Sequence, residues 1–89
     1  MYTSKIKSLD VENIIAGIDY LIFKYTENNN DIKNAVILIP SNVYKVLTKK
    51  IKKGIEGDLG LKNSLGWWKL LEDKYLDNTM VILNRNLFW

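Results

Sequence analysis

Short apolar runs separated by polar turns define the predicted secondary structure of this 89-residue chain. The clearest run is residues 35–39, Ala-Val-Ile-Leu-Ile, in which most residues are β-branched and no polar residue intervenes. A run this short and this rich in valine and isoleucine is typical of a strand that is buried on both faces. Pro40 lacks a backbone donor and ends the pairing, so we predict a central strand over residues 34–39.

A long amphipathic helix is predicted before this strand. Apolar residues recur at helical spacing from Val11 to Tyr25 and indicate a helix over residues 9–26. Ser8 is its candidate N-cap, and the acidic residues that follow suit the positive end of the helix dipole. Phe23 lies off the apolar stripe.

A second helix is predicted directly after the strand, over residues 41–53. Ser41 is its candidate N-cap, and the apolar residues that follow fall on one side of the helix. Gly54 occupies the position where a C-terminal cap is expected. Residues 54–66 contain four glycines and are predicted as a long loop, which in a small domain often has a function.

The last part of the chain is predicted to complete the sheet. Residues 65–76 fit either a helix capped by Ser64 or a strand over residues 67–71, and we favour the strand. Residues 79–83 form a compact apolar strand after an Asp-Asn turn, and residues 2–7 are compatible with a short edge strand. The predicted order is α-β-α-β-β, in which the fourth element, residues 67–71, could instead be a helix. This order predicts an α+β fold. We expect one domain of all 89 residues, with a three-stranded sheet covered by two helices.

The composition bears on the chemistry of the protein because histidine and cysteine are both missing. The commonest general base, a thiol nucleophile and the main transition-metal ligands are therefore not available. The acidic residues match no known metal-binding loop, and we interpret them as surface residues of turns. We predict a non-enzymatic protein with no cofactor, no metal site and no small-molecule substrate.

Five lysines in the second predicted helix are the main basic feature of a chain with a net charge of +3. Lys45, Lys49, Lys52 and Lys53 recur at the spacing of one helical face, and Lys50 lies nearby. This face is a candidate for binding phosphates or an acidic partner. A solvated face whose last-turn lysines suit the helix dipole is the more common origin of such a pattern.

Aromatic residues gather towards the C-terminus as candidate partner-binding residues, namely Trp67, Trp68, Tyr75, Phe88 and Trp89. Tryptophan serves both as a core residue and as an interface hot spot, so a plain core role is the alternative. Adjacent residues of a strand point to opposite faces of the sheet. Only one of Trp67 and Trp68 can therefore enter the core of a sheet covered on one side.

Three segments, residues 10–15, 35–47 and 73–84, resemble parts of the central domain of tailed-phage major capsid proteins. In that family a long helix leads to a strand, a small polar turn and a second helix, and a strand pair closes the domain. The resemblance implies a capsid-like central domain without the N-terminal arm and the long hairpin loop that link neighbouring subunits. It also favours the strand interpretation of residues 67–71.

These features together predict a small interaction protein encoded by a phage or mobile element. It would act through its aromatic C-terminal surface and basic helix, in a capsid-like or assembly role. The alternatives are an anti-CRISPR-type inhibitor of a host nucleic-acid-handling or defence complex, and a direct nucleic-acid binder. We expect the partner to be a protein or a second copy of the chain. No apolar run spans a membrane and residues 1–10 do not form a signal peptide, so we expect the host cytoplasm or the virion.

Overall fold

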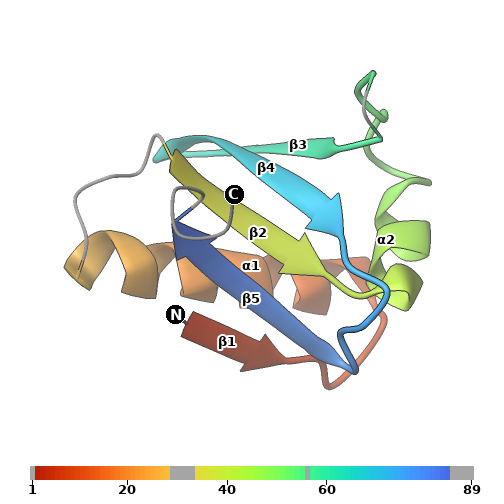
Figure 1. Ribbon diagram of the computed structural model, residues 1–89, viewed down its shortest axis with the longest axis horizontal. Helices are drawn as coiled ribbons and strands as arrows, with labels where there is room; N and C mark the ends of the chain where they lie inside the picture. Colours follow the sequence, from red (N-terminus) through yellow and green to blue (C-terminus); the bar gives the residue numbers. More distant parts are fainter. Residues whose placement is uncertain (1, 29–33, 56, 85–89) are drawn as a thin grey trace.

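Two helices lie on one face of a five-stranded mixed sheet in the computed structural model, which describes residues 2–28, 34–55 and 57–84 (Figure 1). The elements in chain order are β1 (Tyr2–Lys5), α1 (Val11–Asn28), β2 (Ala35–Ile39), α2 (Ser41–Leu47), β3 (Leu59–Asn63), β4 (Gly66–Glu72) and β5 (Thr79–Asn84). Helix α1 crosses behind the sheet, and α2 lies near the end where β2 finishes (Figure 1). The α+β class is confirmed, whereas the prediction of three strands is wrong.

The order of the strands in the sheet is β1-β5-β2-β4-β3, which places β2 at the centre. Strand β2 is parallel to β4 and antiparallel to β5, and the outer pairs β1–β5 and β3–β4 are antiparallel. The predicted strands over residues 34–39, 67–71 and 79–83 are confirmed as β2, β4 and β5. The ambiguous segment is therefore a strand, as favoured.

The two edge strands account for the difference from the predicted three. β1 lies within residues 2–7, which were compatible with a short edge strand but were not counted in the predicted sheet. β3 lies inside the segment predicted as a loop. The glycine and lysine of β3 disfavour a strand locally, but pairing with β4 overrides this preference. In β3 the buried Leu59 and half-buried Leu61 alternate with the exposed Gly60 and Lys62.

One hydrophobic core lies between the helices and the sheet. Helix α1 contributes the predicted apolar stripe, with buried Ile14, Ile18, Leu21, Ile22 and Tyr25. The sheet and α2 contribute Ile37, Ile39, Val43, Leu47, Leu59, Trp68, Leu70, Met80 and Ile82. Among the described helices, none combines the length and apolar character needed to cross a membrane.

Helix α1 is confirmed, but it begins and ends two residues later than predicted, at Val11 and Asn28. The carbonyl of Asp10 accepts the helical hydrogen bond from the Ile14 N–H at 3.0 Å. The Ser8 hydroxyl oxygen accepts from the Asp10 N–H at 3.1 Å, so Ser8 closes the turn before the helix instead of capping its first turn.

Strand β2 is buried on both faces, as its sequence predicted. Ile37 and Ile39 belong to the core beneath the helices. Strand alternation places Val36 and Leu38 on the opposite face, together with Val81, which pairs with Leu38. These three side chains are also buried.

Helix α2 is shorter than predicted, because it ends at Leu47 instead of continuing to residue 53. The Thr48 hydroxyl donates to the Lys45 carbonyl at 2.8 Å and competes for the acceptors of the last turn. The Lys50 N–H then bonds to the Leu47 carbonyl at 2.9 Å, which is the i to i−3 spacing of a tightened turn. The predicted caps are also wrong, since Pro40 holds the N-cap position and Thr48 the C-cap position, not Ser41 and Gly54.

Candidate interaction surface

The adjacent residues Trp67 and Trp68 of β4 point to opposite faces of the sheet. Trp68 is 3% exposed and belongs to the core, whereas Trp67 is 71% exposed. The prediction that only one of the two enters the core is confirmed. Trp68 lies in the core of the folded domain, so we leave it out of the candidate surface.

The ring of Trp67 lies against its neighbours on β3. A side chain at Gly60 would begin 3.6 Å from the Cε3 and Cζ3 atoms of this ring, so the glycine leaves room for the indole. Lys62 is the cross-strand partner of Trp67, and its Nζ lies 5.8 Å from the ring centroid. This separation is within the range of a cation–π interaction. Both neighbours restrict the ring while it stays accessible to solvent.

A second lysine lies on the same face of the sheet as Trp67. Lys69 is two residues along β4, where alternation returns the side chain to this face, and it pairs with Gly60. We call Gly60, Lys62, Trp67 and Lys69 the hairpin surface. These four residues place one aromatic ring between two positive charges and include no acidic residue.

The turn between β3 and β4 is fixed by the side chain of Asn63. Its Oδ1 accepts hydrogen bonds from the Trp68 Nε1–H at 3.0 Å and from the Leu65 N–H at 2.9 Å. Its Nδ2 donates to Asp19 Oδ1 of α1 at 3.3 Å. The hairpin is thereby joined to the helix, and Trp67 projects from an ordered strand instead of a free loop.

The other predicted aromatic residues do not join this surface in the described part of the chain. Tyr75 is 96% exposed but follows the far end of β4, and Trp67 is about 16 Å from Glu72 along the strand at the usual rise per residue. Phe88 and Trp89 lie outside the described residues.

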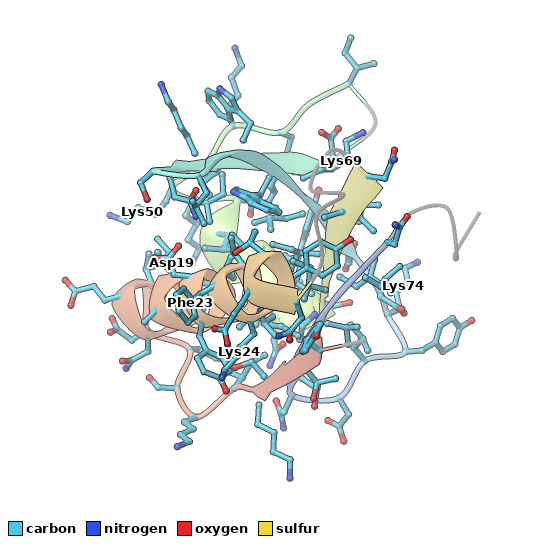
Figure 2. The ribbon with its side chains drawn as sticks, turned by 90° about the vertical axis from the view of Figure 1, so that its left-hand side faces the viewer. Asp19, Phe23, Lys24, Lys50, Lys69 and Lys74 are labelled. Carbon is cyan, nitrogen blue, oxygen red and sulfur yellow. The ribbon has the colours of Figure 1, made fainter. Side chains whose placement is uncertain are left out.

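The predicted basic helix face is not continuous. Of the five lysines only Lys45 lies in α2, because the helix ends before Lys49, Lys50, Lys52 and Lys53. Lys53 instead forms an isolated bridge with Leu59 of β3. Figure 2 shows Lys50 and Lys69 as separate positions on the molecule.

Neither lysine of the hairpin surface was predicted from the sequence. Lys69 was recognisable, because strand alternation from Trp67 places it on the same face. Lys62 was not, since its position beside Trp67 depends on the unpredicted strand β3. Phe23, which lay off the predicted stripe, is exposed on α1 as that position implied, and Figure 2 shows it beside Asp19 and Lys24.

Within residues 2–28, 34–55 and 57–84, no group of three or more acidic residues is placed to hold a metal ion. The candidate site is a surface of one aromatic and two basic side chains, an arrangement suited to binding. Comparisons with protein-family models, with curated proteins and with solved structures found no match to this chain.

Proposed function

We propose that this chain is a non-enzymatic interaction protein that binds an acidic protein partner through the hairpin surface. The observation that supports the proposal most strongly is the 71% exposure of Trp67 beside the buried Trp68. Tryptophan is among the residues most enriched at interface hot spots. An ordered strand presents this one to solvent, so binding immobilises few additional groups.

The charge of the hairpin surface defines the kind of partner. Lys62 and Lys69 flank Trp67 on the same face, without an acidic residue among them. Complementary potentials accelerate association and exclude wrong partners. The fitting partner therefore carries a pocket or groove for an indole, with carboxylates at its rim.

The resemblance to capsid central domains suggests a more specific form of this proposal, in which the partner is another copy of the chain. A symmetric contact would bring Lys62 and Lys69 of two copies together, which like charges oppose. Self-assembly must then join the hairpin surface to a different, acidic surface of the next copy. Such head-to-tail contacts close into rings or extend into filaments.

Single-stranded nucleic acid is a second candidate ligand, and the position of Trp67 between two lysines favours it. Bases stack on exposed aromatic rings, and each stack is worth about 1–3 kcal/mol. The lysines would contact the phosphates on either side of the stacked base. Binding of this type weakens steeply with salt.

The proposal is tested by affinity capture from cells that encode the protein, with the tagged full chain as bait. We compare the natural chain with Trp67→Ala and with Tyr75→Ala. Tyr75 is a matched control because it is even more exposed but lies beyond the far end of β4, away from Lys62 and Lys69. We expect the partner to be retained by Tyr75→Ala and reduced at least tenfold by Trp67→Ala. Equal capture by Trp67→Ala, with unchanged circular dichroism, would contradict the proposal.

The second candidate is tested separately by the fluorescence anisotropy of a labelled single-stranded oligonucleotide. Nucleic-acid binding through the two lysines predicts an affinity that falls about sevenfold between about 50 and 200 mM salt and is lost in Trp67→Ala. An anisotropy that stays unchanged at low salt eliminates this candidate and leaves the protein partner.

A further inference from the structure

A groove of about 480 Å³ runs between β1, together with the residues that follow it, and the side of α1 that faces this strand. Its lining includes Ser4, Lys5, Lys7, Asn13, Gly17 and Tyr20. Strands β1 and β3 form opposite edges of the sheet, four inter-strand spacings or about 19 Å apart. The groove is therefore distinct from the hairpin surface.

Gly17 allows α1 to approach the sheet beside this groove. A side chain at this position would begin 2.9 Å from the Met80 Cε and 3.4 Å from the Ser4 Oγ. The helix therefore lies close to β1 and β5, and it forms one wall of the groove. Tyr20, 53% exposed, lies one turn further along the same wall.

The backbone of β1 determines what the groove can hold. The Ile6 N–H donates to the Asn78 carbonyl at 2.7 Å, and the antiparallel register continues from this pair along the strand. In such a register alternate residues bond to the neighbouring strand, so Ser4 bonds towards β5 whereas Thr3 and Lys5 direct their N–H and C=O groups away from it. Among the described strands, none pairs with this outer edge.

The side chains of β1 alternate in the same way. Tyr2 faces α1, where its ring packs edge-on against that of Tyr25 with 6.4 Å between the ring centroids. Ser4 lies against Gly17. Thr3 and Lys5 point to the other side and are exposed. A strand added beside β1 would continue this alternation, so every second side chain would enter the groove beside α1.

We propose that the outer edge of β1 binds an extended, acidic segment of a partner protein by strand addition. Among the described residues, Lys5 and Lys7 are the only charged ones that border the groove, and the Lys5 side chain does so from the opposite face of β1. Acidic side chains on the added strand would lie across from them, and apolar side chains would enter the groove. A second copy of this chain fits less well, because it would bring its own lysines to the same edge.

The test uses the isotope-labelled full chain and the hexapeptide Glu-Val-Glu-Val-Glu-Val as the probe, with Lys-Val-Lys-Val-Lys-Val as its counterpart. We expect the acidic peptide to shift the amide resonances of β1 and of α1 around Gly17, and to leave those of Trp67 and Lys69 unchanged. The basic peptide should shift none of them. The proposal is overturned if neither peptide, or both equally, shifts the β1 resonances.

Thr3→Pro is the decisive variant. It removes an outward N–H without removing a bond to β5, and an edge strand tolerates proline at such a position. We expect Thr3→Pro to bind the acidic peptide at least tenfold more weakly, with an otherwise unchanged spectrum. Lys5→Glu should weaken binding of the acidic peptide in the same way. The proposal is overturned if Thr3→Pro folds and binds the peptide as well as the natural chain does. It is also overturned if light scattering shows that the natural chain is a dimer and that Thr3→Pro is a monomer.

Discussion

The indole Nε1–H of Trp68 and the side-chain oxygen of Asn63 form a hydrogen bond of 3.0 Å that connects the two strands of the β3–β4 hairpin. The same oxygen accepts the Leu65 N–H in the turn. One amide therefore satisfies the only polar atom of a buried tryptophan side chain and closes the turn. This arrangement directs Trp68 into the core and leaves Trp67 on the opposite face.

Removal of the Asn63 amide should destabilise the domain. Asn63→Ala leaves the buried Trp68 Nε1–H without its partner, and an unsatisfied buried donor costs about 1–3 kcal/mol. We expect a loss of this size in the free energy of unfolding measured with urea. Ser64→Ala, in the same turn and exposed, is the control and should change stability by less than about 0.5 kcal/mol. Equal effects of the two substitutions would contradict this role of Asn63.

The two tryptophans of β4 should respond oppositely to the same substitution. Trp68→Phe removes buried volume and the donor to Asn63, and we expect a loss of about 1–3 kcal/mol in unfolding free energy. Trp67→Phe changes an exposed ring and should stay within about 0.5 kcal/mol of the natural chain. Thermal and urea unfolding measure both values. A larger loss for Trp67→Phe than for Trp68→Phe would show that the strand has the opposite orientation.

The lysines beside Trp67 should affect partner binding, and those after α2 should not. Lys62→Glu and Lys69→Glu each introduce a repulsive charge into the hairpin surface, and we expect each to weaken binding of the captured partner at least tenfold. Lys49→Glu and Lys50→Glu are controls with the same change in net charge, at residues of the turn that follows α2. Titration calorimetry measures the affinities, and equal weakening by all four variants would mean that only net charge matters.

The hydroxyl of Tyr44 should stabilise the segment that follows α2. It donates to the Gly57 carbonyl, and Gly57 has a φ of 81°, a conformation that favours glycine. Tyr44→Phe keeps the ring and removes this hydrogen bond, so we expect a loss of about 1 kcal/mol in unfolding free energy. Faster amide exchange in residues 54, 57 and 58 should accompany it. Unchanged stability and unchanged exchange would show that the hydrogen bond contributes nothing in solution.

The sequence predicted α1 and the inner strands because their apolar patterns are long or uninterrupted. It missed β3 because this strand depends on pairing with β4, which no local pattern of glycine and lysine reveals. It extended α2 too far because lysines are good helix formers, whereas the helix ends where Thr48 bonds back to Lys45.

The candidate site was predictable to a similar degree. Strand alternation indicated that one of the adjacent tryptophans is exposed, and Trp67 is that residue. Alternation alone does not show which face of an isolated strand is covered, so Trp68 could not be excluded from the sequence. Lys62 could be placed beside Trp67 only once the pairing register of β3 and β4 was known.

Site-specific photo-crosslinking tests the central claim most directly, because it reports what touches Trp67 in the cell. A benzophenone amino acid replaces Trp67 in one variant and Tyr75 in the matched control, in cells that encode the protein. We predict that position 67 crosslinks to one acidic protein, or to an acidic surface of another copy, and that position 75 does not. An absence of crosslinks at position 67, or the same crosslinked products from both positions, would contradict the proposed role of the hairpin surface.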